Sequence, residues 1–331
     1  MKVRAGVAWL LLLMSAQLWA VTREVNLVLV GDIMLDDGPG RVIASGRDPL
    51  VHFSSLITRA DYAIANLECP VASVGVATAG KMFAFRAAPA ALTALKGRFQ
   101  AVSLANNHSG DYGRSAFLQT IELLDKAGVH HFGGGRNLAE AHAPLWIERN
   151  GLRIALLGYN EYKPREFEAG PDWPGIAWSE DWRVLADIRA ARAAGADIII
   201  PFLHWGWEKE PNPSARQRQL AHTLIDAGAD VVVGSHPHVT QGAEYYRGKL
   251  IVYSLGNFVF DSFKTQATRT GWLLELHLNA TGLLDWRTVA AWLDEEGVPQ
   301  RLPAAQTPCC KAADPRVQVC VNSATACGFK P

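Results

Sequence analysis

The sequence predicts an α/β domain, and three features of the chain support this fold class. Short runs of β-branched and other apolar residues recur along the chain, and amphipathic helical segments separate several of them. Several of these runs end directly in Asp, Glu, Asn or His. The chain has 331 residues, of which 49% are hydrophobic and 19% charged, so it can bury a large core. We therefore expect one large α/β domain over residues 23–302.

The strands are predicted from short apolar runs that are bounded by turn-forming residues. In chain order they are residues 25–30, 62–65, 101–105, 153–157, 197–203, 230–233, 250–253, 272–278 and 283–293. The expected helices are residues 89–95, 113–127, 180–194 and 214–227. The clearest is 113–127, where Phe117, Ile121 and Leu124 share one face and Gly128 is a stop signal. Residues 71–88 and 163–178 read as loops.

The N-terminus resembles a secretory signal peptide over residues 1–20. Lys2 and Arg4 precede an apolar stretch at 5–14, and a cleavage site follows Ala20. The alternative is an uncleaved membrane anchor, but the apolar run is shorter than the roughly 20 residues that span a bilayer. We therefore expect export, with the protein in the periplasm or the cell envelope.

The predicted C-terminal tail, residues 303–331, is rich in cysteine. Its four cysteines are Cys309, Cys310, Cys320 and Cys327, and Cys69 is left over. Two disulfides are expected in an oxidising compartment, and three pairings are open. A zinc site is the competing interpretation, but the Cys-x-x-Cys spacing is absent.

The charge balance excludes one class of partner. Lys and Arg together number 32, as do Asp and Glu, so no basic field indicates a nucleic-acid partner.

Polar residues at the ends of the predicted strands indicate a metal site. Ligands of open α/β sheets bind beyond the carboxyl ends of the strands. Each such residue alone has an ordinary explanation as a turn former or a hydrogen-bonded core residue. Together they form a set of carboxylate, amide and imidazole donors: Asp32, Glu68, Asn107, His108, His204, His236 and His238. This mixture suits zinc, manganese or iron better than calcium or magnesium.

The motifs around these residues resemble the CapA family of bacterial capsule-synthesis proteins, which is associated with poly-γ-glutamate. The matching segments are Gly-Asp-Ile-Met-Leu (31–35), Asn-Leu-Glu-Cys-Pro (66–70), Leu-Ala-Asn-Asn-His-Ser (104–109), His-Trp-Gly (204–206), Gly-Ser-His-Pro-His-Val (234–239) and Tyr-Ser-Leu-Gly-Asn-Phe-Val-Phe-Asp (253–261). They occur in the family's order. The resemblance implies a two-sheet α/β sandwich flanked by helices, like that of calcineurin-type metallophosphoesterases, with the site at the strand ends.

The resemblance also implies a metal-ligand set. One ion would be held by Glu68, Asn107, His204 and His236, with Asp32 as a bridge, and a second by Asp32, Glu68 and His238. The related phosphoesterases have Asp-x-His in the first motif, and this chain has Met34 at the histidine position. A thioether is a weak donor, so one divalent metal ion is expected rather than two. The resemblance implies that Asp32 and His108 are the catalytic residues, with His108 as the general acid.

The implied function is synthesis or attachment of an anionic extracellular polymer, by metal-assisted hydrolysis or transfer. The expected partners are an anionic polymer or phosphate-bearing substrate and the capsule-synthesis machinery at the membrane. Lys81, Arg86 and Asn257 are candidates for substrate binding, although the two cations read equally well as solvated surface charge. Two rivals stay open: a periplasmic metallophosphoesterase unrelated to capsule, and a non-catalytic polymer-binding scaffold, which Met34 favours.

Overall fold

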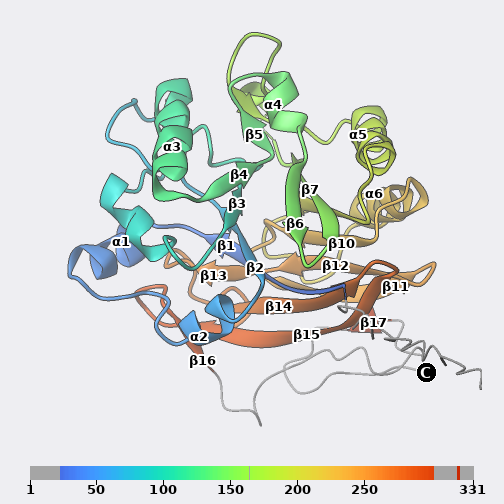
Figure 1. Cartoon of the computed structure of the whole chain (residues 1–331). Helices are drawn as coiled ribbons and strands as arrows, with labels where there is room; N and C mark the ends of the chain where they lie inside the picture. Colours follow the sequence, from blue (N-terminus) through green and yellow to red (C-terminus); the bar gives the residue numbers. More distant parts are fainter. Residues whose placement is uncertain (1–22, 164, 302–318, 321–331) are drawn as a thin grey trace, which may run out of the picture.

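The computed structural model describes residues 23–163, 165–301 and 319–320. The predicted signal peptide and the tail residues Cys309, Cys310 and Cys327 lie outside the described residues. Two large β-sheets pack face to face, with helices on their outer faces (Figure 1). The predicted two-sheet α/β sandwich is thereby confirmed. Within the described ranges, the structure contains no helix with the length and apolar character needed to span a membrane.

The first sheet is centred on β1. Its order is β16–β15–β14–β1–β2–β3–β4, and β13 pairs with β1 off this path. Strand β1 runs parallel to β2 and β13 and antiparallel to β14. The strands are β1 (Glu24–Ile33), β2 (Tyr62–Leu67), β3 (Ala101–Ser103), β4 (His130–Phe132), β13 (Asn257–Val259), β14 (Thr270–Asn279), β15 (Gly282–Leu293) and β16 (Pro299–Arg301).

The second sheet has a parallel centre made of β12, β10, β9 and β7. Its order is β17–β11–β12–β10–β9–β7–β6. The strands are β6 (Leu145–Arg149), β7 (Leu152–Asn160), β9 (Ile198–His204), β10 (Val231–Ser235), β11 (Thr240–Tyr246), β12 (Lys249–Leu255) and β17 (Val319–Cys320). Strand β17 comes from the predicted tail and pairs antiparallel with β11, so this part of the tail joins the sheet.

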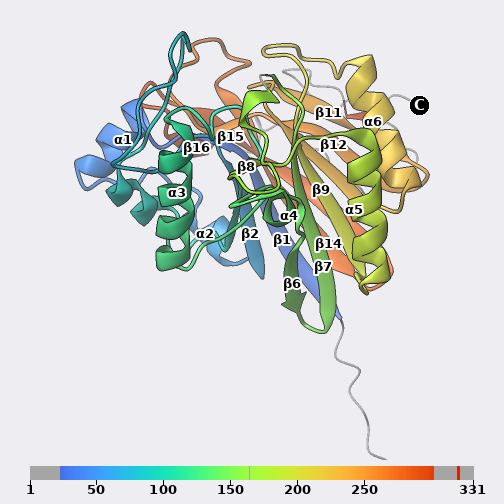
Figure 2. The same cartoon turned by 90° about the horizontal axis from the view of Figure 1, so that it is seen from above.

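The helices cover the two outer faces of the sandwich. Helices α1 to α3 lie over the first sheet, and α5 and α6 lie over the second (Figure 2). They are α1 (Asp37–Ala44), α2 (Ser54–Thr58), α3 (Gly113–Ala127), α4 (Leu138–His142), α5 (Asp181–Ala193) and α6 (Ala215–Asp226), with 3-10 turns η1 (Pro89–Ala94) and η2 (Arg165–Phe167). A two-residue pair, β5 (Gly134–Gly135) and β8 (Gly175–Ile176), completes the elements.

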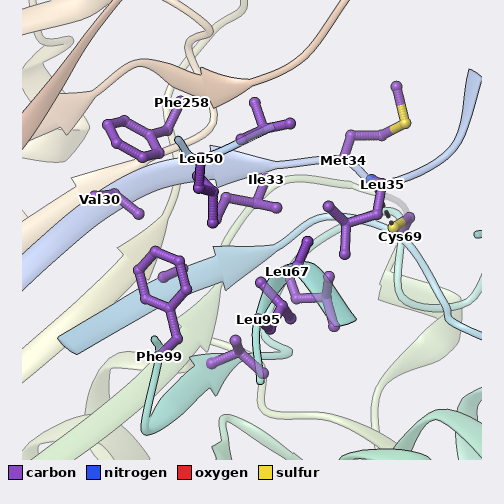
Figure 3. Packing of buried hydrophobic residues seen from close by; sticks show 14 of the residues in the cluster. Val30, Ile33, Met34, Leu35, Leu50, Leu67, Cys69, Leu95, Phe99 and Phe258 are labelled. Carbon is purple, nitrogen blue, oxygen red and sulfur yellow. Dashed lines mark hydrogen bonds between the residues drawn. The ribbon is translucent and has the colours of Figure 1, made fainter. Parts of the chain in front are cut away.

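The hydrophobic residues form three layers of core. One layer fills the space between the sheets and includes Leu27, Leu29, Val231 and Val252, all fully buried. The other two layers lie under the helices on each side. Figure 3 shows part of the layer beside the first sheet, where the side chains after the end of β1 pack against those of β2.

The strand register brings the polar strand ends together. In the first sheet Asp32 lies opposite both Asn66 and Asn257. In the second sheet His204 lies opposite Asn160 and Ser235. Because β1, β2, β7, β9 and β10 all carry these residues at their carboxyl ends, one edge of the sandwich collects the polar groups.

Candidate metal centre

Two buried carboxylates form one side of the centre. Asp32 Oδ1 accepts a hydrogen bond from Asn66 Nδ2 at 2.9 Å, and its Oδ2 accepts one from the backbone N–H of His236 at 3.3 Å. Glu68 follows β2 and is fully buried, and neither of its carboxyl oxygens has a hydrogen-bond partner among the described residues. Burial raises the pKa of Glu68 well above its usual range, and the charge of Asp32 adds to this effect. Such a carboxylate needs a cation or a donor to be stable.

Three buried imidazoles form the other side. His204 Nε2 lies 3.1 Å from His236 Nδ1 and 3.5 Å from Glu68 Oε1. The Nε2 atom of His236 is buried and lacks a hydrogen-bond partner within the described residues. Asn257 Oδ1 accepts from His238 Nδ1 at 2.8 Å, which leaves His238 Nε2 on the side of Glu68 Oε1, 3.7 Å away. The three imidazoles therefore lie within a few ångströms of the two carboxylates, and one ring nitrogen, His236 Nε2, has no partner among the described residues.

The turn that holds His236 and His238 is strained. Their φ angles are +96° and +55°, in a region that non-glycine residues seldom adopt. Backbone strain of this kind concentrates at functional sites, where the surrounding structure fixes it. Pro237 lies between them, and its carbonyl accepts a hydrogen bond from the backbone N–H of Lys209 at 2.7 Å. The strained turn aims both imidazoles at the same point.

Electrostatics keep two of the imidazoles neutral. Burial lowers the pKa of His204 well below its usual range, and a positive charge on His236 would lower it further. Burial likewise lowers the pKa of His236, with the neighbouring His238 as the next cause. Neutral imidazole is the form that binds metal ions.

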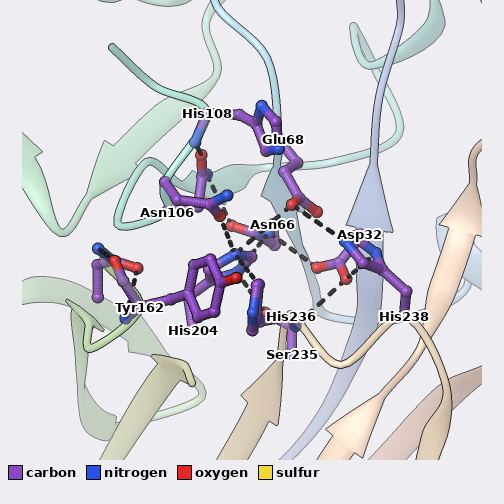
Figure 4. Close-up of polar contacts among 12 residues, drawn as sticks. Asp32, Asn66, Glu68, Asn106, His108, Tyr162, His204, Ser235, His236 and His238 are labelled. Carbon is purple, nitrogen blue, oxygen red and sulfur yellow. Dashed lines mark hydrogen bonds and ion pairs between the residues drawn. The ribbon is translucent and has the colours of Figure 1, made fainter. Parts of the chain in front are cut away.

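These residues fit a divalent metal ion. Two overlapping groups have donor atoms within 4.8 Å of one another: Glu68, His236 and His238, and Asp32, Glu68 and His204 (Figure 4). Asn107 is half-buried, and its Oδ1 lies 2.7 Å from His204 Nε2, so it borders the same space. The unpartnered oxygens of Glu68 and the free nitrogen of His236 are the atoms that an ion would satisfy. The structure thus gathers every predicted ligand at one point.

Met34 lies in the hydrophobic core. It is fully buried in the layer shown in Figure 3, and its sulfur accepts a hydrogen bond from the backbone N–H of Asp36 at 3.1 Å. At this position the calcineurin-type phosphoesterases have a histidine. As the sequence predicts, this protein has no nitrogen donor there.

Replacing Met34 with leucine should leave the metal content unchanged. The thioether has a partner in the core, so an apolar side chain of similar volume can replace it at a cost below about 1.5 kcal/mol. Elemental mass spectrometry of the purified variant measures this. A loss of metal from Met34→Leu would show that the sulfur is a ligand and contradict the placement.

His108 has a fixed orientation. Asp111 Oδ2 lies 2.7 Å from its Nδ1, and the ring of Phe85 packs on the imidazole with 4.7 Å between centroids. Burial lowers the pKa of His108, while the Asp111 carboxylate acts in the opposite direction. With Nδ1 held, Nε2 is the nitrogen available for proton transfer. Asp111 was not predicted as a functional residue. Its position three residues after His108 in one loop was the available signal.

The predicted substrate-binding residues form hydrogen bonds and ion pairs with other residues of the protein. Lys81 Nζ forms an ion pair with Asp111 and donates to the backbone carbonyl of Asn107 at 2.6 Å. It therefore borders the site and supports the His108 loop.

Arg86 and Asn257 also have partners within the protein, and a role for either residue in substrate binding stays a prediction. The guanidinium of Arg86 donates to the carbonyls of Val74 and Gly75 and lies over the ring of Tyr112, 4.3 Å from its centroid. Asn257 is fully buried, and its side chain bonds His238 Nδ1 and the carbonyl of Thr268. In this position Asn257 orients the imidazole of His238.

Two further features of the site were not predicted from the sequence: a hydrogen-bond network of asparagine side chains and the contact of a tyrosine ring with His236. Asn106 Nδ2 donates to Asn66 Oδ1 at 3.1 Å, and Asn66 in turn donates to Asp32. Both asparagines lie inside the motifs at the strand ends, which was a usable signal. Tyr162 stacks on His236 with 3.8 Å between centroids, and nothing in its sequence context indicated this (Figure 4).

The fold and these donors define an α/β sandwich protein whose buried carboxylates and imidazoles can hold a divalent metal ion. The sequence model of the bacterial capsule synthesis protein family PGA_cap matches residues 26–262, and the chain belongs to this family. The family recognised from the motifs is thereby confirmed.

The chain is also similar to two named capsule-biosynthesis proteins. The chain is 35% identical to the PGA biosynthesis protein CapA of Bacillus subtilis (strain 168), over 82% of this chain and 75% of the relative. It is 33% identical to the capsule biosynthesis protein CapA of Bacillus anthracis, over 85% of this chain and 70% of the relative. Among solved structures, the NAD nucleotidase of Haemophilus influenzae (NadN) is similar with a TM-score of 0.49 and 12% identity, over 85% of this chain and 60% of that chain.

Proposed function

We propose that this protein is exported and acts at the cell envelope in the biosynthesis of an anionic polymer of the poly-γ-glutamate type. The observation that carries the proposal is the 35% identity with the PGA biosynthesis protein of Bacillus subtilis over 82% of this chain. The predicted signal peptide at residues 1–20 supports the location. The partners in this proposal are the polymer and the capsule-synthesis machinery at the membrane.

The chemistry we propose is hydrolysis or transfer at an amide or phosphoester bond. Asp32, Glu68, His204, His236 and His238 would hold the ion, with Asn107 at the border. A divalent ion held there acts as a Lewis acid that stabilises negative charge on the group under attack.

The protein's own residues supply orientation and a proton. The imidazole of His108 is held by Asp111 through Nδ1, which directs Nε2 toward a leaving group. A carboxylate that fixes the tautomer of a histidine in this way also favours its protonated form. The ring of Phe85 excludes water from one face of that imidazole.

Replacing Asp111 with asparagine should lower kcat about a hundredfold, because the imidazole loses the group that fixes its tautomer and protonated form. Metal content should stay the same, since Asp111 is not one of the ligands. Turnover of γ-glutamyl and aryl phosphate substrates by the purified protein measures the effect. His108→Gln serves as the second variant, because Asp111 also bonds Lys81 and the backbone N–H of Phe85. Unchanged kcat in both variants would exclude the general-acid role.

The biological role is tested in the organism's own cells. Deleting the gene should abolish the extracellular polymer, and the wild-type gene should restore it. Polymer output that is unchanged by the deletion would refute the proposal.

A polymer-binding scaffold is the second candidate, and the placement of Met34 in the core favours it because it removes a donor from the centre. Under this candidate a His236→Ala, His238→Ala double variant that folds would still restore full polymer output. A periplasmic phosphoesterase would instead show turnover of an aryl phosphate that disappears in His204→Ala.

A further inference from the structure

A cavity of about 640 Å³ lies beside the metal centre, a size that is usual for ligand pockets in proteins. Its walls come from the segment after β7 and from the first residues of α5 and α6. These two helices lie next to each other in Figures 1 and 2. None of the residues in its walls belongs to the metal centre.

One short segment joins the cavity to the metal centre. The backbone N–H of Glu161, which lines the cavity, donates to the carbonyl of His204 at 2.9 Å. The next residue is Tyr162, whose ring covers the imidazole of His236. A chain-like ligand in the cavity would therefore continue over Tyr162 toward the metal centre.

Most charges in the cavity are already matched. Arg165 Nη1 donates to Glu180 at 2.7 Å, and Arg216 Nη1 donates to Asp181 at 3.0 Å. Arg216 also donates from Nε to Oε1 of Glu161. The two guanidinium groups are thus occupied by carboxylates of the protein, so they are not free to bind an anion.

Glu161, Ser179 and Lys163 each have a polar group in the cavity without a partner among the described residues. The Oε2 atom of Glu161 and the hydroxyl of Ser179 are buried and have no hydrogen bond, and Ser179 is only 2% exposed. Lys163 is exposed, and no ion pair or hydrogen bond is found for its ammonium within the described ranges.

The unpartnered groups define the chemistry of a ligand. A buried carboxylate oxygen requires an N–H or O–H donor, and a free ammonium favours an anion. The indole of Trp182 lines the same cavity and is 62% exposed, which provides a surface for a hydrocarbon segment. A neutral sugar lacks the anion, and inorganic phosphate lacks the hydrocarbon. An amino-acid unit with an N–H and a free carboxylate has all three features: a hydrogen-bond donor, an anion and a hydrocarbon segment.

We propose that this cavity binds an amino-acid unit of a peptide or polymer, with its N–H on Glu161 and its free carboxylate on Lys163. The hydrocarbon part lies on Trp182, and the hydroxyl of Ser179 completes the hydrogen bonding. Binding itself rests only on the cavity. Its role as a subsite for the polymer that reaches the metal centre rests on the proposed function.

Calorimetric titration of the purified, metal-loaded protein with γ-glutamylglutamate tests the proposal. We expect saturable binding that weakens about tenfold or more in Glu161→Gln, which turns the acceptor into a donor, and in Lys163→Met. Ser179→Ala should weaken it less. Glu122→Gln and Lys126→Met, on exposed positions of α3, are matched controls and should bind as the wild type does.

Further ligands show which chemical groups the cavity recognises. Glutarate has the carboxylates without the N–H, so its binding should be much weaker. Free glutamate and an N-acetylated dipeptide separate an ammonium from an amide donor, and binding of either supports the proposal. Three results would overturn the proposal. They are binding of glutarate or trigalacturonate as tight as that of γ-glutamylglutamate, wild-type affinity in both Glu161→Gln and Lys163→Met, and the absence of saturable binding. The titration measures binding alone, so a failure of the polymer function remains distinct from a failure of the cavity.

Discussion

Replacing His236 with alanine is expected to remove the divalent metal ion and, under the proposed function, the polymer output of complemented cells. His236 is fully buried, and its Nε2 is one of the donor atoms that lack a partner. Loss of a residue that merely orients a metal ligand reduces metal affinity by about 10- to 100-fold, so loss of a ligand should reduce it at least 100-fold. Elemental mass spectrometry of the purified protein and polymer output in complemented cells measure the two effects.

The matched control is His142→Ala. His142 is also a buried histidine, 8% exposed, and its Nδ1 contacts Asp187, which also accepts from Tyr159; none of the three residues is among the candidate metal ligands. Its loss should lower stability but leave the metal content as in the wild type. If His236→Ala retained its metal, or if His142→Ala lost it equally, the donor set described above would be wrong.

The set of candidate donor residues was readable from the sequence because several of them lie at the ends of apolar strands. Asp32, Glu68 and His204 lie at or next to the ends of β1, β2 and β9, and parallel strands align their carboxyl ends. The helix at 113–127 was also predicted with its observed bounds, because its apolar face and its C-terminal glycine are local signals.

The partners of these residues were harder to predict because they depend on tertiary contacts. Tyr162 reaches His236 through the pairing of β7 and β10 with β9 in the second sheet. Asn257 reaches His238 across the antiparallel β11–β12 pair, in which Thr240 lies opposite Leu255. The same applies to Arg86, whose stacking on Tyr112 cannot be read from a basic residue in a loop. Helix α1 was missed because it contains Gly38 and Pro39, which argue locally against a helix.

Replacing Gly31 with alanine is expected to destabilise the protein and to disturb the metal centre together. A methyl group on Gly31 would lie 1.8 Å from the carbonyl oxygen of Gly256, which is backbone and has no rotamer to adopt. Relieving the overlap requires a shift of β1 against residues 255–257, so the free energy of unfolding should fall by about 3 kcal/mol. Urea unfolding measures this, and metal content measures the effect on the neighbouring Asp32.

Gly46→Ala is the control for this substitution. Gly46 has φ +79° and no atom within 4 Å of an added methyl group, so alanine there should cost only about 1 kcal/mol for its left-handed backbone. An equal loss of stability in the two variants would show that the close approach at Gly31 is absent. The approach matters because the backbone N–H of Asp32 donates to that same Gly256 carbonyl at 3.0 Å. Glycine before Asp32 therefore lets β1 lie close enough to residues 255–257 to hold the carboxylate against His236 and His238.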